Sequence, residues 1–519
     1  MTGPLDSGYV GAVARHSGSA PAIVMAADGT TVSYADLDRR STQFARLLDD
    51  SGLRIGDHVA LVMANDVRFL EVCWGALRSG RYCTPINPRS TSAELDYLVR
   101  DCGAAIVVAA SAAAERVRDV AAGVGAVRQV FAVNAAIPGV EDYEAVLATT
   151  SAEPLADETE GSMLLYSSGT TGRPKGIERP LSGLPPGSSN PLAAYMERVQ
   201  FGPDTVFFSA GPLYHAAPAG WSLSAQRVGG CVVLPERFDA EQMLAAIERY
   251  RVTHAQLVPT MMLRLLRLPV EVRNRYDVSS VQRIVHAAAP CPAHVKRGMI
   301  DWFGPIVDEY YAGTEGIGAT YVTSAEWLTR PGTVGRPISG EVAILDPAGE
   351  PLGPGEVGTI YFAPLNPYHY RNDASATAAR VRADGWATLD DVGYVDDDGY
   401  LYLTDRRTYM IVVGGVNIYP REVEDALLAH PAVADVGVIG VPDEEYGEAV
   451  KAVVQLEPDA VGGDDLAVAL QAHCRSVLSA IKCPRSIDFV AELPRTETGK
   501  LRKGPLREQY WAGHESRIV

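Results

Sequence analysis

The sequence predicts an α/β protein with a large N-terminal domain of layered sheets and helices and a smaller unit at its C-terminal end. Segments with a helical period of hydrophobic residues alternate with short β-branched runs through the first several hundred residues. This alternation is typical of largely parallel sheets covered by helices. The chain, at 519 residues, is also longer than one ordinary domain, so a second unit is expected.

The elements of the N-terminal part can be placed by their periodicity. Hydrophobic residues recur with helical spacing over residues 69–79 and 240–250, which predicts two amphipathic helices. Short β-branched runs predict strands over residues 105–109, 129–133, 254–258 and 306–310. No repeat of fixed period and no low-complexity tract stands out in the sequence.

The pattern changes after a strand expected over residues 399–404, which ends at the polar residues 405–408. A helix over 420–429, with proline at its first position, and a strand over 433–441 follow. The remaining hundred or so residues are a common size for a domain. A separate C-terminal domain is therefore expected, although one continuous domain with a turn at 405–408 also fits the pattern.

Charge and composition exclude some classes of protein. The formal charge of −18 argues against a general nucleic-acid binder, which usually presents a basic face. The longest apolar run, around residues 104–114, is shorter than the roughly 20 residues that span a bilayer. No apolar signal segment follows the first residues, and the seven cysteines show no C-x-x-C spacing. We therefore expect a soluble, cytoplasmic protein with reduced thiols and no membrane span.

Residues 166–176, Tyr-Ser-Ser-Gly-Thr-Thr-Gly-Arg-Pro-Lys-Gly, carry the sharpest local motif. Glycines let the backbone wrap an anion, hydroxyl and N–H groups donate to phosphate oxygens, and Lys175 adds a cation. The Gly-Lys-Ser/Thr ending of a Walker A loop is missing. A plain Ser/Thr-rich surface loop is the alternative, but it rarely combines such glycines with a Pro-Lys-Gly ending.

Other residues are ordinary when each is taken alone. Tyr311 and Glu315 follow a predicted strand, and could stack on a base and hold Mg²⁺, yet a glutamate at a turn is usually a surface residue. Asp391 could accept hydrogen bonds from ribose hydroxyls, although a turn aspartate is commoner. Three further residues, Arg406, Lys500 and His215, would by themselves be read as surface or core residues.

In their order along the chain, these motifs resemble the acyl-adenylate-forming superfamily, which includes acyl-CoA synthetases, adenylation domains of peptide synthetases and beetle luciferases. The resemblance runs from residue 33 to Lys500 and is closest to acyl-CoA synthetases. It implies an N-terminal AMP-binding domain over 1–405, a hinge at 406–408 and a mobile α+β domain over 409–519. It also implies an enzyme that uses ATP, Mg²⁺ and coenzyme A to convert a carboxylic acid into a thioester.

The resemblance further implies a role for each site residue. The nucleotide phosphates are expected to meet Ser167, Ser168, Gly169, Thr170, Thr171 and Lys175. Thr314 and Glu315 would serve the α-phosphate and Mg²⁺, with Glu315 as the metal ligand. The remaining nucleotide-binding residues are Ala288, Ala289, Pro290, Glu309, Tyr310, Tyr311, Asp391 and Arg406. His215 would gate the carboxylate, Lys500 would catalyse adenylation, and Gly414 and Gly415 would line the path of the coenzyme A thiol.

Some positions depart from the family pattern. Asp390 stands where many relatives have glycine, so it rivals Asp391 for the ribose. Thr408 replaces the usual hinge residue, and Val412 replaces a frequent second lysine, which leaves Lys500 as the candidate cation of the mobile domain. These changes concern domain rotation more than the reaction.

The acid itself is the least defined part of the prediction. Small residues at 287–289 beside Trp221, Met261 and Met262 suggest a wide pocket for a bulky apolar acid, whether fatty, alicyclic, steroid-like or terpenoid. An adenylating enzyme that loads the phosphopantetheine of a carrier protein is an alternative, and a non-catalytic nucleotide-binding module is a remote one. The sequence does not indicate an oligomeric state.

Overall fold

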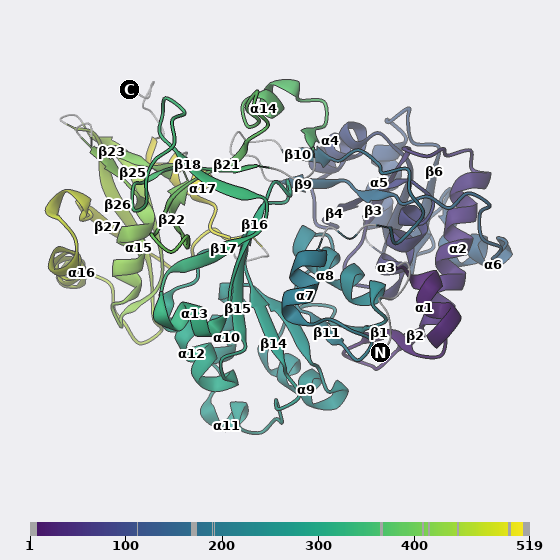
Figure 1. The fold of residues 1–519 in the computed structure, drawn as a ribbon, viewed down its shortest axis with the longest axis horizontal. Helices are drawn as coiled ribbons and strands as arrows, with labels where there is room; N and C mark the ends of the chain where they lie inside the picture. The colour runs from purple at the N-terminus through teal and green to yellow at the C-terminus, as the bar shows by residue number, and fades with distance from the viewer. Residues whose placement is uncertain are drawn as a thin grey trace.

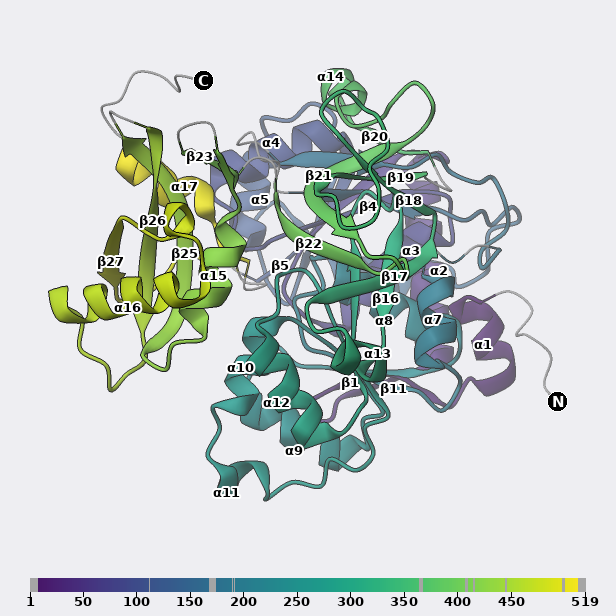
Figure 2. The ribbon, with the colours of Figure 1, turned by 60° about the vertical axis from the view of Figure 1, so that its left-hand side comes forward.

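A computed structural model describes residues 8–111, 113–167, 174–188, 190, 192–363, 367–406, 409–413, 416–443, 446–496 and 500–511. Figures 1 and 2 show a large N-terminal part and a smaller yellow-green C-terminal part that stands to one side of it. This arrangement confirms the predicted fold class. Within the described residues, no helix is both long and apolar enough to cross a membrane.

The first sheet is entirely parallel and has the order β7-β6-β5-β3-β4-β8. Its strands are β3 (His58–Val62), β4 (Tyr82–Ile86), β5 (Ala104–Ala110), β6 (Gln129–Val133), β7 (Glu141–Asp142) and β8 (Ser162–Met163). All residues of β3 and β4 are buried, as expected for parallel strands that helices cover on both faces. The strands predicted over 105–109 and 129–133 are confirmed.

The second sheet is mixed and has the order β18-β19-β21-β22-β17-β16-β15-β14-β13-β11-β12-β1-β2. Its first half comprises β1 (Pro21–Met25), β2 (Thr31–Ser33), β11 (Val206–Ser209), β12 (Cys231–Leu234), β13 (His254–Leu257), β14 (Arg283–His286) and β15 (Val307–Ala312). From β1 to β15 the neighbouring strands are parallel, and β2 is an antiparallel edge. The predicted strands at 254–258 and 306–310 lie here.

The other half of this sheet is antiparallel. The prediction of largely parallel sheets was therefore wrong for these strands. It comprises β16 (Ala319–Val322), β17 (Thr333–Ser339), β18 (Glu341–Leu345), β19 (Gly358–Ala363), β21 (Ala387–Val395) and β22 (Leu401–Arg406). The reason is connection length. Residues 313–318, which join β15 to β16, are too few for the crossover of about a dozen residues that parallel strands need.

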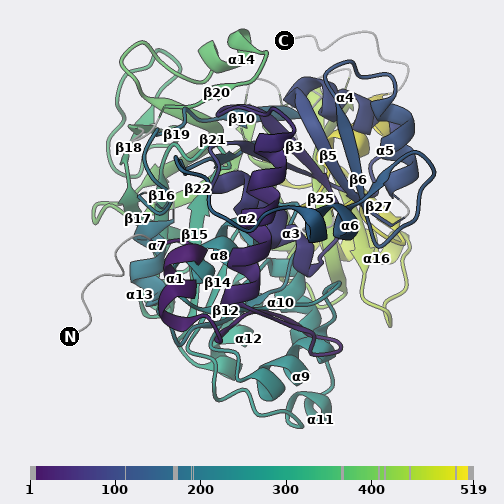
Figure 3. The same cartoon turned by 90° about the vertical axis from the view of Figure 1, so that its right-hand side faces the viewer.

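Helices pack between the two sheets and over their outer faces. The predicted helices are confirmed as α3 (Val67–Leu77) and α9 (Ala240–Tyr250). α2 (Tyr34–Asp50), which runs vertically in Figure 3, packs on α3, and α3 contacts both β3 and β1, so one hydrophobic core joins the two sheets. The other N-terminal helices are α1 (Val10–Ser17), α4 (Ser92–Cys102), α5 (Ala113–Ala121), α6 (Tyr143–Thr149), α7 (Ala193–Val199), α8 (Ala216–Arg227), α10 (Pro259–Leu266), α11 (Val270–Arg273), α12 (Ala293–Phe303), α13 (Ser324–Thr329) and α14 (Ala374–Ala378).

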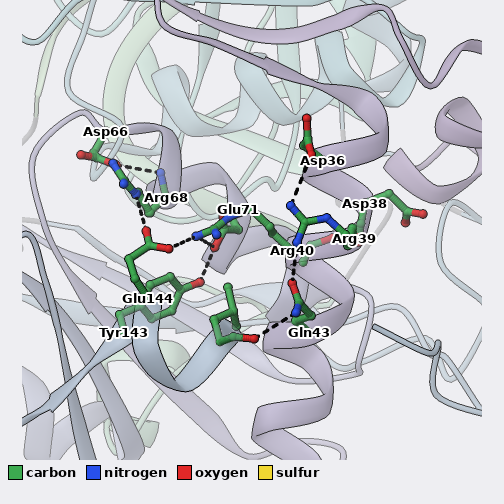
Figure 4. Close-up of polar contacts among 12 residues, drawn as sticks. Asp36, Asp38, Arg39, Arg40, Gln43, Asp66, Arg68, Glu71, Tyr143 and Glu144 are labelled. Carbon is green, nitrogen blue, oxygen red and sulfur yellow. Dashed lines mark hydrogen bonds and ion pairs between the residues drawn. The ribbon is translucent and has the colours of Figure 1, made fainter. Parts of the chain in front are cut away.

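A buried polar network fastens α6 to α2 and α3 (Figure 4). Arg40 of α2 donates to both carboxylate oxygens of Glu71 on α3 and, over 2.9 Å, to Glu144 of α6. The Tyr143 hydroxyl donates to Glu71 from the other side. The Glu71 side chain is only 4% exposed, so its charge depends on these partners.

A small sheet of order β20-β10-β9 lies at the phosphate motif. Its strands are β9 (Leu165–Ser167), β10 (Lys175–Glu178) and β20 (His369–Tyr370), all antiparallel to their neighbours. β9 and β10 form a hairpin in which Ser167 pairs with Lys175. The sheet therefore positions the two ends of the phosphate loop.

The C-terminal part has its own sheet and its own core. Its elements are β23 (Ile411–Val413), β24 (Val416–Ile418), α15 (Pro420–Leu428), β25 (Val433–Asp443), β26 (Gly447–Leu456), α16 (Asp464–Val477), a 3₁₀ turn (Ala480–Lys482), β27 (Ser486–Val490) and α17 (Lys503–Trp511). The predicted helix at 420–429 and the predicted strand at 433–441 are confirmed. An ion pair of 2.7 Å between Arg267 and Glu457 links this part to the N-terminal part. The exact domain limits and the hinge at 406–408 stay predictions.

Candidate active site

The two ends of the phosphate motif lie on β9 and β10, which pair antiparallel. Ser167 and Lys175 face each other where the two strands begin to separate. Four of the predicted phosphate-binding residues, Ser168, Gly169, Thr170 and Thr171, lie outside the described residues, so their role stays a prediction.

The Tyr370 side chain links Lys175 to Glu315. The Lys175 ammonium pairs with the Asp373 carboxylate at 3.2 Å and lies 5.5 Å from the centre of the Tyr370 ring. The Tyr370 hydroxyl donates to the Glu315 carboxylate over 2.7 Å. The fold thus brings together a cation and a carboxylate that the sequence separates by 140 residues.

Thr314 and Glu315 lie in a tight turn that follows β15. The turn closes with a 3.0 Å hydrogen bond from the Gly316 N–H to the Gly313 carbonyl. Glu315 is 8% exposed, and among the described residues Tyr370 donates to one of its two carboxylate oxygens, Oε1. No cluster of three or more His, Cys, Asp or Glu side chains forms a metal site among the described residues. Since Mg²⁺ in nucleotide sites is commonly held by one or two carboxylates and by substrate phosphates, a single carboxylate beside a phosphate loop fits Mg²⁺.

Tyr311 of β15 and Asp391 of β21 meet, although three strands lie between β15 and β21 in the large sheet. The Tyr311 hydroxyl donates to the Asp391 carboxylate over 2.6 Å, and Asp391 is 7% exposed. Asp390 instead points away, pairs with Arg380 at 2.8 Å and has a φ of +61°. Of the two rival aspartates, the geometry therefore favours Asp391 as the partner of a nucleotide that Tyr311 covers.

Glu309 and Tyr310 lie on opposite faces of β15, because side chains alternate along a strand. Glu309 accepts a 2.7 Å hydrogen bond from the buried Lys296 ammonium, and His286 lies 3.6 Å from the same carboxylate oxygen. Burial lowers the pKa of His286 to about 4, against the opposing effect of Glu309. The Glu309 carboxylate is thus engaged in an internal ion pair beneath the site.

Tyr310 belongs to an aromatic group on the other face. Its hydroxyl accepts a 3.1 Å hydrogen bond from the Trp221 indole, and its ring lies 5.1 Å from that of Tyr195. Ala287, which directly follows β14, packs in the same core. Residues 288–290 follow it, and Ala288 has a φ of +74°. The predicted acyl-pocket edge therefore adjoins an aromatic wall.

His215 stands at the N-cap of α8, the helix that carries Trp221. Burial lowers the pKa of His215 to about 4, so its imidazole is neutral at pH 7. Its Nε2 atom is buried and has no hydrogen-bond partner within the described part of the chain. A neutral imidazole with an unused polar atom suits a gate that contacts a substrate.

Of the four predicted site residues from 406 onward, the structure describes Lys500 and Arg406. Lys500 is half-buried in a loop that two hydrogen bonds with Thr496 close, at 2.8 and 3.0 Å. Arg406 ends β22 and pairs along the backbone with Asp391, which places it next to the predicted ribose site. Gly414 and Gly415 lie outside the described residues, between β23 and β24.

Sequence reasoning missed three residues of this site: Tyr370, Asp373 and Arg179. Arg179 follows β10 and donates to the Thr314 carbonyl over 2.6 Å. The only sequence signal for Arg179 was its even spacing from Lys175, which places both side chains on the same face of an extended segment. Tyr370 and Asp373 reach the site by a long-range pairing of strands, for which the sequence contains no local signal.

The comparisons agree with this geometry. The sequence matches the AMP-binding enzyme family over residues 11–365 and the AMP-binding enzyme C-terminal domain over residues 422–500. The chain belongs to the AMP-binding enzyme family. This result confirms the resemblance to the acyl-adenylate-forming superfamily and the expectation of an enzyme.

Two curated relatives of this AMP-binding enzyme are named as CoA-dependent. Feruloyl-CoA synthase of Amycolatopsis sp is 34% identical over 486 residues, which cover 93% of this chain and 94% of the relative. Medium/long-chain-fatty-acid–CoA ligase FadD8 of Mycobacterium tuberculosis is 30% identical over 535 residues, which cover 99% of this chain and 91% of the relative. The nearest group is therefore the acyl-CoA synthetases.

One solved relative is available in two forms. ATP-bound MatB from Rhodopseudomonas palustris aligns with a TM-score of 0.84 at 28% identity, covering 98% of this chain and all of MatB. Apo MatB aligns at the same identity and coverage with a TM-score of 0.74. Because both structures have the MatB sequence, the difference in TM-score reflects a difference in how the MatB chain is arranged in space. The AMP-binding enzyme described here is arranged more like the ATP-bound form.

Proposed function

We propose that this enzyme is an ATP-dependent acid–CoA ligase that forms an acyl-adenylate and then an acyl-CoA thioester. The contact between Tyr311 and Asp391, close to Glu315 and the phosphate hairpin, is the observation that carries the proposal. A tyrosine ring, a ribose-accepting carboxylate and a metal-binding carboxylate are the groups that one ATP molecule with Mg²⁺ requires.

The proposed chemistry follows from the poor reactivity of carboxylates. The carboxylate oxygen attacks the α-phosphorus of ATP, the bond to the β-phosphate breaks, and pyrophosphate leaves. Lys175 and Lys500 would offset the charge on the phosphate oxygens, and Glu315 would hold Mg²⁺, which neutralises phosphate charge when bound. The thiol of coenzyme A then attacks the activated carbonyl, the thiol proton is released, and AMP leaves.

The proposal includes a movement of the C-terminal domain. Lys500 would be presented to the α-phosphate for the first step, and the loop at Gly415 would line the thiol path for the second. The resemblance to the superfamily supports this sequence of events. The separate sheet and core of the C-terminal part support a unit that can rotate as one body.

For the acid, we propose a bulky apolar carboxylic acid, whether fatty, alicyclic, steroid-like or terpenoid. The small residues at 287–289 support this class, as do the named activities of the relatives, which include a feruloyl-CoA synthase and a fatty-acid ligase. However, Trp221 and Met262 are 1% and 0% exposed and pack in hydrophobic cores. An acid would therefore rest against the Trp221–Tyr310 wall rather than pass through it.

The location of the protein is also a proposal. The seven cysteines are free, and all but Cys291 are buried. Unpaired thiols are usual in a reducing compartment, which supports the cytoplasm.

A screen of acids tests the proposed function. Purified enzyme with ATP and Mg²⁺ is offered aliphatic, aromatic and polycyclic acids, with pyrophosphate release as the readout. Each active acid is then tested with coenzyme A and with a holo-carrier protein. We expect release with apolar acids and thioester formation on coenzyme A. A thioester on the carrier alone would favour the carrier-loading alternative, and release with small polar acids alone would contradict the proposed acid.

A further inference from the structure

We propose that Arg179 is a positioning residue for adenylation, because its guanidinium fixes the turn that carries Thr314 and Glu315. It would thereby hold the Glu315 carboxylate in place for Mg²⁺ and the ATP phosphates. The inference rests on the proposed function and deepens it, since it adds a residue to the same site.

The geometry of β10 places Arg179 on the side of the strand that faces the turn. Side chains alternate along a strand, so Lys175, Ile177 and Arg179 share one face. Ile177 packs there in the core that contains Tyr370, whereas Glu178 points the other way, to Arg371. Lys175 stands at one end of this face and Arg179 just beyond the other, about 13 Å along the strand.

The two cations of this face bracket the Thr314–Glu315 turn. At one end, Lys175 lies over the Tyr370 ring, whose hydroxyl donates to Glu315. At the other end, the Arg179 guanidinium donates to the Thr314 carbonyl over 2.6 Å. The turn is therefore held on one side by Arg179, which follows β10, and on the other by Tyr370, whose strand pairs with β10.

Close packing restricts the turn further. Gly316 adopts a φ of +67°, and a Cβ atom added there would lie 2.6 Å from the Arg179 guanidinium nitrogen Nη2. The backbone of Arg179 is itself fixed, because the Tyr82 hydroxyl donates to its carbonyl over 2.6 Å. Loss of the guanidinium would leave a space beside Gly316 and free the turn to move.

The positive charge of Arg179 also lies near Glu315, but Arg179 does not bond to the Glu315 carboxylate in the described structure. Burial lowers the pKa of Arg179, while the nearby charge of Glu315 opposes the shift, and an arginine stays protonated at pH 7. Among the ion pairs of the described residues, none joins Arg179 to Glu315. A direct pair would compete with the metal, whereas a bond to the Thr314 carbonyl leaves the carboxylate available.

Metal binding in the Arg179→Met variant tests the proposal without relying on turnover. The probe is Mn²⁺ with α,β-methylene-ATP, which cannot release pyrophosphate, and Mn²⁺ binding is followed by electron paramagnetic resonance. Partners that orient a metal ligand typically contribute about 10- to 100-fold in affinity or activity. We expect the half-saturating Mn²⁺ concentration to rise by at least about 10-fold, with a parallel loss of pyrophosphate exchange.

The second half-reaction separates positioning from general stability. Arg179→Met should still form thioester from synthetic acyl-adenylate and coenzyme A at the wild-type rate, even if its Tm falls because the Thr314 carbonyl loses its hydrogen bond. As a matched control, Arg249→Met removes an exposed arginine that lies over the Tyr250 ring, and it should bind Mn²⁺ like the wild type. Wild-type Mn²⁺ binding by Arg179→Met, or an equal loss of both half-reactions, would overturn the proposal.

Arg179→Lys keeps the test decisive if the methionine variant does not fold. A lysine retains the charge but replaces the planar fork with a flexible ammonium, so its half-saturating Mn²⁺ concentration should lie above the wild-type value. A wild-type value would count against Arg179. Failure of the wild-type enzyme to form AMP with any acid would instead refute the proposed function, so the two failures are distinguishable.

Discussion

The hydroxyl of Tyr311 donates a 2.6 Å hydrogen bond to the carboxylate of Asp391, which lies 80 residues further along the chain. This contact joins the end of β15 to β21. It favours Asp391 over Asp390 as the carboxylate that we propose for the nucleotide ribose.

Matched substitutions of the two aspartates test this selection. Asp391→Asn should raise the KM for ATP by about 10- to 100-fold, since a hydrogen bond to a charged group contributes roughly 1.5–3 kcal/mol. Asp390→Asn should change it little, because Asp390 pairs with Arg380 and asparagine tolerates its φ of +61°. Steady-state kinetics at saturating acid measures both. The opposite ranking would show that Asp390 holds the ribose.

The two half-reactions should depend on different residues of the C-terminal domain. Lys500→Ala should slow pyrophosphate exchange by about 10²–10³, the usual effect of removing one charge-stabilising group, yet still convert acyl-adenylate and coenzyme A to thioester. Gly415→Leu should do the reverse, because a side chain there would obstruct the thiol. Lys482→Ala, which removes a lysine paired with Glu422, is the control. Equal loss of both steps in both variants would argue against domain rotation.

The Arg40–Glu71 network should contribute to stability and not to catalysis. Glu71→Gln removes the buried charge that Arg40 faces but keeps the pair of Arg40 with Glu144, so the cost should lie between the roughly 1 kcal/mol of an exposed pair and the roughly 3–5 kcal/mol of breaking a buried pair from one side. Arg39→Gln breaks a pair whose side chains are 50% and 54% exposed, which should cost at most about 1 kcal/mol. Chemical denaturation measures the two losses. Similar values for both variants would contradict the importance assigned to burial.

Stability should fall as the pH drops below neutral, in part through His286. Burial lowers its pKa from 6.5 to about 4, so between these values the unfolded chain binds a proton that the folded protein does not. The free energy of unfolding then decreases by up to about 1.4 kcal/mol per pH unit for this residue. The free energy of unfolding is measured between pH 8 and pH 4 for the wild type and for His286→Leu, each relative to its own value at pH 8. It should fall less steeply with falling pH in His286→Leu than in the wild type. An identical decline would mean that His286 is protonated in the folded protein.

Much of the fold could be predicted because local patterns determine it. The helical spacing of residues 240–250 and the β-branched run at 129–133 correspond to α9 and β6 without a shift. The antiparallel half of the large sheet was missed because the strand–helix alternation that predicts parallel neighbours ends at β15, where only residues 313–318 lead to β16.

Site residues could be predicted where they lie in one short motif. They could not be predicted where strands far apart in the sequence bring them together. The phosphate hairpin and the Tyr311–Glu315 turn follow from short runs of sequence. Tyr370 reaches Glu315 only because the two-residue strand β20 pairs with β10. The choice between the two aspartates depended on an irregularity between β19 and β21 near residue 390, where strict alternation of side chains fails.

The identity of the nucleotide product tests the central claim most directly. Purified enzyme is incubated with ATP, Mg²⁺, coenzyme A and an acid that the screen finds active, and the products are separated by chromatography. An adenylating enzyme forms AMP and pyrophosphate in amounts equal to the thioester. Formation of ADP and orthophosphate instead would contradict adenylation.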